Sequence, residues 1–502
     1  MVEQRRPYFY KYNPGVSFMF SLQQGISIYI LIINILLAVA VVFLERRNVA
    51  ATWSWLMVLL FVPIVGFVLY IILGQKMSRR KLYRLNEREV EIMRKLTQAQ
   101  ARRIHEGQIE YKDPEIEHYK DTIYLNVKAN KALLTQNNEV ELFTEGNSKF
   151  EDLLAKIEAA QHHIHFQYYI INTDELGQRV LAALTRKAAE GVQVRILYDD
   201  IGSRQLNDKF FRAFTAAGGQ RAAFFPSRIP YLNLRVNYRN HRKVVVIDGK
   251  IGYIGGFNVG NEYIGLSKKF GFWRDTHLRL RGNSVHSLQA LFIRDWNLAS
   301  QTPVDYNPTY FPPVEEPGHG DVPIQLIASG PNQKWSHIEN MYIKMIHSAR
   351  RSIYLQTPYF IPDESLQNAL RIAALSGIEV KVMIPYDADH LFVHWASLYY
   401  VGELLPAGVK CYLYRKGFLH AKALIIDGTI STVGTANFDQ RSLKLNFETN
   451  AVLYHAPTSQ KLQNIFLEDM KDSVELTEAE YDNRSLWHRL MEGISNLLSP
   501  IL

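Results

Sequence analysis

The sequence predicts an α/β protein with two lobes, formed from a duplicated α/β unit and preceded by an N-terminal hairpin of two transmembrane helices. Three observations predict it: a sixteen-residue pattern occurs twice, similar strand–helix–strand sequences lie upstream of both copies, and two uncharged apolar stretches lie near the N-terminus. About 400 of the 502 residues remain beyond a membrane segment, which suffices for two domains of the usual ~100 to 200 residues.

The repeated pattern reads HRKVVVIDGKIGYIGG at 241–256 and HAKALIIDGTISTVGT at 420–435. A single match to H-x-K-x-x-x-x-D can arise by chance, but two copies with matching glycine turns indicate a duplication. Side chains at i and i+2 of a strand share a face, so each His and Lys can contact one ligand, while each Asp points away. The motif residues are His241, Lys243 and Asp248, and His420, Lys422 and Asp427.

The duplication extends upstream of both motifs. Residues 163–200 align with residues 352–387 as strand, turn, amphipathic helix, glycine and strand. The apolar strands and the 3.6-residue helical period predict largely buried sheets. The first lobe is therefore expected at 136–320 and the second at 321–502, offset by roughly 180 residues.

The N-terminal 74 residues are expected to form a membrane anchor. Residues 25–44 and 54–73 are each 20 residues long without a formal charge, and a helix of that length spans the ~30 Å hydrocarbon layer. A cleaved signal peptide is the alternative for the first stretch, with small residues at 48–51. Against it, the apolar core exceeds the usual length of about 7 to 15 residues, and a second span follows at once.

The distribution of charge sets the expected orientation and partners. The formal net charge of +8 favours nucleic acid or an acidic lipid surface, and the two spans favour the lipid. Basic residues dominate residues 76–88, whereas the connecting loop has only Arg46 and Arg47 beside Glu45. The positive-inside tendency then predicts a multi-pass protein of the cell membrane with both lobes on the cytoplasmic side.

Residues 75–135 are expected to form a basic juxtamembrane linker. Within it, residues 76–106 form either a solvated connecting helix or a basic helix that rests on anionic headgroups, and the neighbouring anchor favours the second. The only cysteine, Cys411, excludes an internal disulfide and a Cys/His zinc site.

Two facing His-Lys pairs predict chemistry on phosphodiesters. If the lobes pack about a pseudo-two-fold axis, two imidazoles and two ammonium groups converge. A neutral imidazole can attack phosphorus while a protonated one donates to the departing oxygen. Lysines can stabilise the negative charge of the transition state, so neither a metal nor another cofactor is expected.

Other polar residues occur at matched places after each motif. Asp275 and Glu448 are candidates to hold the histidine tautomers, although each alone could be an ordinary exposed strand carboxylate. Asn258 and Asn437 follow the glycine turns and are candidate donors to substrate phosphate oxygens. Asp248 and Asp427 face away and should fix the hairpins more than touch substrate.

The duplicated motif resembles the signature of the phospholipase D superfamily. Together with residues 53–74, TPYFIPD (357–363), GFLHAK (417–422) and LLSPIL (497–502), it makes the chain similar to bacterial cardiolipin synthases over essentially its full length. The resemblance implies a two-lobed phospholipase D-like fold. It also implies that one phosphatidylglycerol gives its phosphatidyl group to an enzyme histidine and a second accepts it, yielding cardiolipin and glycerol.

The resemblance further implies that His241 is the nucleophile and that His420 acts as acid and then base; near-symmetry leaves the reverse assignment open. Hydrolysis by water remains an alternative with the same residues. A nuclease has little use for two membrane spans, and a scaffold would not need two His-Lys pairs, so no nucleic acid partner is expected.

Three tracts carry open alternatives. Residues 225–240 form either a surface loop or part of a lipid pocket, and residues 390–405 form either a core helix or part of that pocket. Residues 487–498 have apolar positions at helical spacing. They predict an amphipathic helix that packs on the catalytic domain or, secondarily, contacts the membrane interface.

Overall fold

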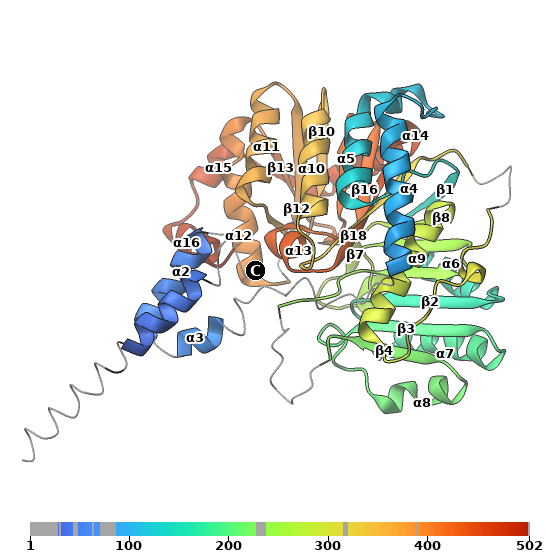
Figure 1. Cartoon of the computed structure of the whole chain (residues 1–502). Helices are drawn as coiled ribbons and strands as arrows, with labels where there is room; N and C mark the ends of the chain where they lie inside the picture. Colours follow the sequence, from blue (N-terminus) through green and yellow to red (C-terminus); the bar gives the residue numbers. More distant parts are fainter. Residues whose placement is uncertain are drawn as a thin grey trace, which may run out of the picture. The chain divides into compact units, whose positions relative to one another are not determined.

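The computed structural model describes residues 29, 32–43, 49–62, 65–70, 87–226, 237–314, 320–387 and 389–499. The chain divides into two compact units (Figure 1). One comprises residues 1–76 and 234–236, and the other comprises residues 77–233 and 237–502.

The described part of the N-terminal unit is helical. It contains a helical stretch at 32–43, α2 (Val49–Phe61) and α3 (Val65–Leu69). Val41, Leu59 and Tyr70 are buried together, and the Trp55 ring meets the Tyr70 ring edge-on with centroids 5.4 Å apart. A small apolar cluster therefore packs within this unit, whereas many of its other apolar side chains, including Leu36, Phe43 and Phe61, are exposed.

The predicted membrane spans fall partly outside the described residues. These are residues 25–28, 30–31, 44, 63–64 and 71–73 of the spans 25–44 and 54–73. Within the ranges that the structure describes, no helix combines the length and the apolar character needed to cross a bilayer.

The first lobe of the larger unit contains a seven-stranded sheet. In pairing order its strands are β1 (Asn138–Phe143), β8 (His277–Gly282), β6 (Ile251–Gly255), β5 (Val244–Ile247), β2 (His163–Tyr168), β3 (Gln193–Asp199) and β4 (Gln220–Phe224). Its helices are α6 (Gly146–Glu158), α7 (Glu175–Ala189), α8 (Asp208–Ala216) and α9 (Ser284–Ala299). Strands β2, β3 and β4 are parallel, and the other pairs are antiparallel.

The second lobe contains an eight-stranded sheet. In pairing order its strands are β19 (Ser473–Leu476), β13 (Lys410–Tyr414), β12 (Glu379–Pro385), β10 (Ser352–Gln356), β15 (Ala423–Ile426), β16 (Ile430–Gly434), β18 (Glu448–Leu453) and β9 (Ile324–Ser329). Its longer helices are α10 (His337–Ser348), α11 (Glu364–Leu375), α12 (Leu391–Gly402), α14 (Ala456–Lys471) and α16 (Leu486–Leu498), and α13 (Gln440–Lys444) and α15 (Glu478–Asp482) are short.

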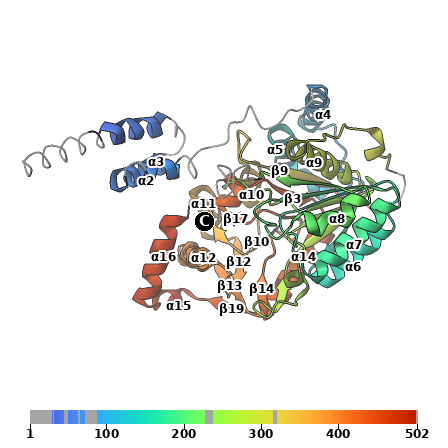
Figure 2. The ribbon, with the colours of Figure 1, turned by 90° about the horizontal axis from the view of Figure 1, so that it is seen from below.

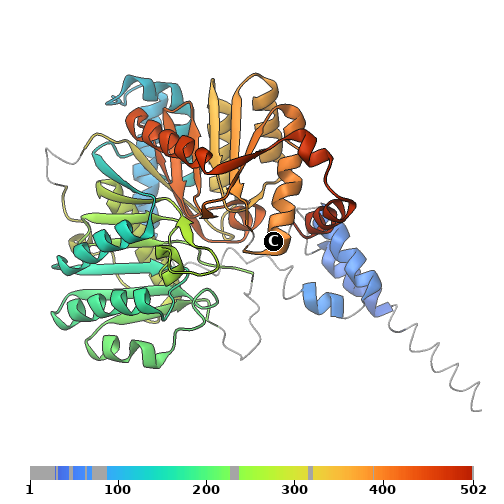
Figure 3. The same ribbon diagram turned by 180° about the vertical axis from the view of Figure 1, so that it is seen from behind.

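The two sheets have the same topology. The order β1-β8-β6-β5-β2-β3-β4 corresponds strand by strand to β9-β18-β16-β15-β10-β12-β13, and β19 is an addition at the edge. Figures 1 and 3 show the two sheets beside each other, with the first lobe in teal to yellow-green and the second chiefly in yellow, orange and red. The prediction of two α/β lobes from one duplicated unit is confirmed.

The lobes share a hydrophobic core. Val244, Val246 and Leu278 of the first sheet belong to the same buried cluster as Leu419 and Ile425 of the second lobe. Two short parallel pairs complete the β-structure: β14 (Gly417–Leu419) joins β7 (Phe272–Arg274) across the lobes, and β11 (Phe360–Ile361) joins β17 (Phe438–Asp439). Backbone hydrogen bonds and apolar packing between the lobes therefore fix the positions of the two motifs relative to each other.

The described part of the expected linker 75–135 is folded against the second lobe. It contains α4 (Glu87–His105), a 3₁₀ turn (Pro114–Tyr119) and α5 (Lys120–Asn130). Ile104, Ile123 and Val127 are buried in the same core as Ile338 and Met345 of α10. The segment is thus a structural layer of the second lobe from Thr97 onward, where the first of its described buried side chains lies. Ile92, Met93 and Leu96 of α4 remain exposed.

Candidate active site

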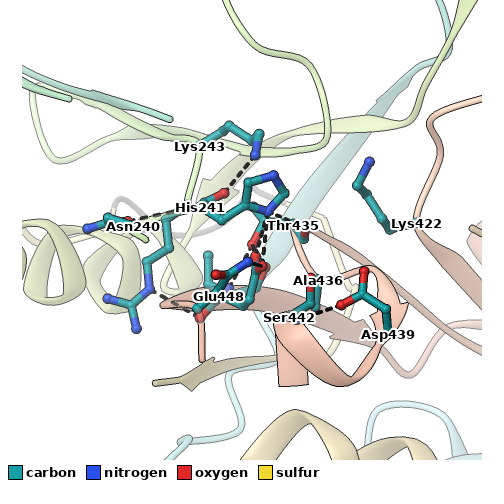
Figure 4. A network of polar contacts seen from close by, with 12 residues as sticks. Asn240, His241, Lys243, Lys422, Thr435, Ala436, Asp439, Ser442 and Glu448 are labelled. Atoms are coloured by element: carbon teal, nitrogen blue, oxygen red, sulfur yellow. Dashed lines mark hydrogen bonds and ion pairs between the residues drawn. The ribbon is translucent and has the colours of Figure 1, made fainter. Parts of the chain in front are cut away.

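The two His-Lys pairs occupy equivalent places in the lobes. His241 and Lys243 directly precede β5, and His420 and Lys422 directly precede β15. All four are at most 8% exposed. Figure 4 shows Lys422 of the second lobe near His241 and Lys243 of the first lobe. The predicted convergence of the two motifs is therefore present.

Each histidine is held by the carboxylate of the other lobe. His241 Nδ1 lies 3.0 Å from Glu448 Oε1 and 3.1 Å from the carbonyl oxygen of Thr435. His420 Nδ1 lies 2.6 Å from Asp275 Oδ2. When Nδ1 carries the hydrogen and donates it to the carboxylate, the lone pair of Nε2 remains available for a ligand. Asp275 and Glu448 thus have the geometry expected of tautomer-holding groups.

Backbone pairing explains why the contacts cross between lobes. The His241 N–H donates to the Phe447 carbonyl oxygen at 3.0 Å, directly before Glu448. The His420 N–H donates to the Arg274 carbonyl oxygen at 2.7 Å, directly before Asp275. Each histidine is therefore aligned with the strand that brings its carboxylate.

A glycine makes room for one of these carboxylates. A Cβ on Gly256 would lie 2.0 Å from Asp275 Oδ1, closer than any side chain can stand. The two glycines at the end of the first motif, Gly255 and Gly256, therefore allow Asp275 to approach the backbone as well as allowing the turn.

The lysines place positive charge next to the histidines. Lys243 Nζ donates to the His241 carbonyl oxygen at 2.7 Å, and Lys422 Nζ lies 2.8 Å from His420 Nδ1. The His420 Nδ1–H donates to Asp275, because the carboxylate is an acceptor whereas an ammonium group can only donate. Lys422 therefore acts on His420 chiefly through its charge.

Burial sets the charge state of the ligand-free site. It lowers the pKa of His241, against the opposing effect of Glu448, and lowers the pKa of His420 to about 4. It also lowers the pKa of Lys243 to about 7 and of Lys422 to about 8. Both imidazoles are then neutral near pH 7. An anionic phosphodiester would favour the charged forms, raising these pKa values on binding.

The carboxylates remain ionised despite burial. Burial works to raise the pKa of Glu448, but His241 and Lys243 outweigh it, and the net pKa is lowered. For Asp275 the same opposition from Lys422 and His420 gives a lowered pKa. Each imidazole therefore faces a fixed negative charge, which stabilises the imidazolium when a proton is taken up.

The motif aspartates lie outside the site, as their odd spacing from the lysines predicts. Asp248 accepts hydrogen bonds from three consecutive N–H groups, Gln161 to His163, at 2.7 to 2.9 Å. Asp427 does the same with Arg350 to Ser352 at 2.7 to 2.8 Å. Their φ values of 54° and 55° belong to the left-handed Asp-Gly turns. Although both belong to the repeated motif, each fixes its hairpin to the start of a neighbouring strand.

The two candidate phosphate-binding asparagines have protein partners. Asn258 donates from Nδ2 to the Tyr263 hydroxyl at 3.1 Å and accepts from the Ile170 N–H at 3.2 Å. Asn437 hydrogen-bonds Asp439, the N-cap of α13, and helps to offset the burial that raises the pKa of Asp439 to about 6. Their donation to a phosphate stays a prediction.

Two buried arginines that the sequence analysis did not select support the orienting carboxylates. Arg242 pairs with Asp295 of α9 at 2.5 Å and donates to the Glu448 carbonyl oxygen at 3.1 Å. Arg274 pairs with Asp469 of α14 at 2.9 Å and donates to the Asp275 carbonyl oxygen. In each lobe a helix carboxylate thus fixes the backbone of the orienting residue through an arginine.

Aromatic rings border the two histidines. The Tyr169 ring meets the His241 ring edge-on with centroids 4.8 Å apart, and Trp273 lies 5.2 Å from His420. Of the tract 225–240, residues 227–236 lie outside the described residues. Within the tract 390–405, Leu391–Gly402 form α12, with Ala396, Ser397 and Val401 buried. Asp389, two residues before α12, accepts a hydrogen bond from the Tyr359 hydroxyl.

The described residues contain no cluster of His, Cys, Asp or Glu suited to a metal ion. The arrangement that is present joins two imidazoles, two ammonium groups and two crossed carboxylates between duplicated lobes. This fold and site define a two-lobed phospholipase D-like enzyme.

The comparisons with known proteins narrow this class. The model of the family "Cardiolipin synthase, PLD-like domain" matches residues 153–296 and 342–470, and "Phospholipase_D-nuclease N-terminal" matches residues 32–75. A cardiolipin synthase of Listeria monocytogenes is 51% identical over 474 residues, 94% of this chain and 98% of the relative. The major cardiolipin synthase ClsA of Bacillus subtilis is 50% identical over 472 residues, with the same coverage. The chain belongs to the cardiolipin synthase family.

A solved structure supports the fold. The phosphatidylserine synthase of Haemophilus influenzae matches with a TM-score of 0.60 at 12% identity, covering 76% of this chain and 100% of that one. At this identity the likeness concerns the fold alone.

Proposed function

We propose that the enzyme transfers a phosphatidyl group from one phosphatidylglycerol to another, producing cardiolipin and glycerol. The observation that carries the proposal is the crossed pairing of two neutral imidazoles with Glu448 and Asp275, flanked by two lysines. The names of the closely similar relatives support the choice of product.

In the first step His241 Nε2 attacks the phosphorus of the donor. A P–N bond forms, the P–O bond to glycerol breaks, and His420 gives the leaving oxygen its proton. The pKa of His420 is about 4 without ligand, so protonation depends on the negative charge of the bound phosphate and of Asp275. Lys243 and Lys422 stabilise the charge on the phosphoryl oxygens.

In the second step His420, now neutral, removes the proton from a glycerol hydroxyl of the acceptor. The hydroxyl oxygen attacks phosphorus, the P–N bond breaks, and cardiolipin leaves with the phosphatidyl group. The assignment of His241 as nucleophile rests on family analogy, because both histidines have equivalent environments.

Hydrolysis is the competing outcome, since water in place of the acceptor would release phosphatidic acid. Purified enzyme incubated with phosphatidylglycerol alone should yield cardiolipin and free glycerol in equal amounts, measured by lipid mass spectrometry and a glycerol assay. Phosphatidic acid as the main lipid product would instead identify a hydrolase.

Catalysis should depend on the lysines and not on a metal ion. Lys243→Ala or Lys422→Ala should lower the chemical rate by roughly 10² or more, as loss of one transition-state donor does. Exposed Lys461→Ala is the control, and activity should survive thorough chelation. Inactivation by chelator that a particular divalent ion reverses would overturn the mechanism.

The enzyme is proposed to be a multi-pass protein of the cell membrane, with spans at 25–44 and 54–73 and the catalytic lobes in the cytoplasm. Asn48→Cys in a Cys411→Ser background should then react in intact cells with an impermeant thiol reagent, whereas Lys461→Cys should react only after lysis. Labelling of Asn48→Cys only in lysed cells would reject this topology.

A further inference from the structure

The C-terminal helix α16 turns its polar side inward. Glu492 and Ser495 are 2% and 0% exposed, whereas the apolar side chains that form its outer face are 41% to 83% exposed. That outer face comprises Leu486, Trp487, Leu490, Ile494 and Leu497. Apolar surface of this extent on one short helix is typical of an interaction site.

A polar anchor fixes this orientation. Arg484 Nε donates to Glu492 Oε2 at 2.8 Å, and the Tyr481 hydroxyl donates to the same oxygen at 3.2 Å. Rotating the helix to bury its leucines would break this ion pair and expose a carboxylate held at 3% side-chain exposure. The ion pair and the hydrogen bond therefore stabilise the orientation in which the apolar face of α16 points outward.

The outer face continues onto α12 and toward the active site. The Trp395 and His488 rings pack with centroids 4.9 Å apart, and Figure 2 shows α16 along its length beside α12. The first turn of α12 exposes Leu391 and Phe392 by 57% and 43%. Further along α12, Ser397 accepts a hydrogen bond from the Phe360 N–H of β11 at 3.0 Å. Strand β11 pairs with β17, whose Asp439 lies near Lys422 of the active site in Figure 4.

The charge and composition of α16 indicate what kind of partner binds its outer face. The only carboxylate of α16 is the buried Glu492, while Arg489 is exposed, so the outer face presents a cation and no anion. Tryptophan beside leucines, with a basic residue at the margin, is typical of helices that lie in the headgroup region of a bilayer.

We propose that the outer face of α16 and the first turn of α12 dock on the surface of an anionic phospholipid bilayer. This docking places the active site near the headgroups and rests on the proposed function, which makes a membrane lipid the substrate. A second copy of the chain and the N-terminal unit are the competing occupants.

The test uses the full chain, reconstituted into vesicles of phosphatidylglycerol and phosphatidylcholine. In a Cys411→Ser background, Leu490→Cys and Ile372→Cys each carry a polarity-sensitive fluorophore; both native residues are 53% exposed, but Ile372 lies on α11. Spin-labelled phosphatidylcholine should quench the probe at 490 and shift its emission to the blue. The probe at 372 should be quenched by aqueous iodide instead.

Equal behaviour of the two probes would overturn the docking. So would a probe at 490 shielded from both quenchers, because a protein surface then covers it, and cross-linking at 490 would distinguish a second copy. These readouts do not require turnover. Failure of the wild-type chain to make cardiolipin, with the probe at 490 still quenched by lipid, would reject the proposed reaction and leave the docking intact.

An activity measurement addresses the consequence of docking. Leu490→Asp should lower cardiolipin synthesis on vesicles roughly tenfold, because a charge replaces exposed apolar area that docking would bury, and leave turnover of dissolved short-chain phosphatidylglycerol within about twofold. Ile372→Asp is the matched control and should alter neither rate. An unchanged vesicle rate in Leu490→Asp would contradict the proposal.

Discussion

His241→Ala should abolish the covalent phosphatidyl-enzyme and lower cardiolipin synthesis by roughly 10⁴ or more, because the nucleophile of a two-step mechanism has no substitute. His420→Ala should still form some adduct, since attack precedes the step that needs a second base, although slow protonation of the leaving glycerol limits the yield. The donor must be labelled in its phosphate or acyl chain, because a headgroup label leaves on attack. Acid quench followed by mass spectrometry locates the adduct.

His455→Ala provides the control, since His455 hydrogen-bonds Thr458 rather than any residue of the site. An adduct mapped to His420 in the His241→Ala protein would reverse the assignment of nucleophile and acid. Cardiolipin formation without an adduct on either residue would reject the covalent mechanism.

The duplicated motif was sufficient to predict the lobes, because motif and flanking periodicity both repeat. The odd spacing of Asp248 and Asp427 from the lysines also predicted that they face away, and their hydrogen bonds to the starts of β2 and β10 give that orientation its purpose. These inferences rest on local geometry, which a sequence carries directly.

The crossed carboxylates could not be assigned from spacing. Asp275 follows His241 in the chain but holds His420, because the partner of each histidine depends on pairing of β7 with β14 and of Asn240 with Phe447. Likewise, the sequence gives Arg242 no evident role between His241 and Lys243, because its partner Asp295 lies on the distant helix α9. Contacts between distant segments need the tertiary structure.

The expected linker shows that composition alone does not predict which segments pack into the core. Charged residues dominate residues 76–106 and favoured a solvated or membrane-surface helix there, within the expected linker 75–135. Ile104 lies in that stretch, and Ile123 and Val127 lie further along the linker. In the structure these side chains complete the core of the second lobe around α10. A few apolar positions at helical spacing were enough to bury the helices, because the lobe supplies the complementary surface.

The crossed arrangement predicts which step each carboxylate supports. Glu448→Gln should slow adduct formation by roughly 10² or more, because it removes the charge that orients His241 and stabilises its positive form. Asp275→Asn should slow both protonation of the leaving glycerol and discharge of the adduct onto the acceptor, because both require His420. Rapid-quench measurement of adduct formation and decay separates the two effects. Glu139→Gln is the control, because Glu139 is a half-exposed carboxylate on β1 that pairs with Arg281.

The pH dependence distinguishes orientation from structural damage. Glu448 raises the pKa of His241, so its removal lowers that pKa further and keeps the imidazole neutral in more acidic solution. The acid limb of adduct formation should therefore move to lower pH in Glu448→Gln, whereas a merely destabilised enzyme would lose activity without that shift. If Glu448→Gln left adduct formation intact and impaired only its decay, Glu448 would serve His420, and the functional pairing would not be the crossed one.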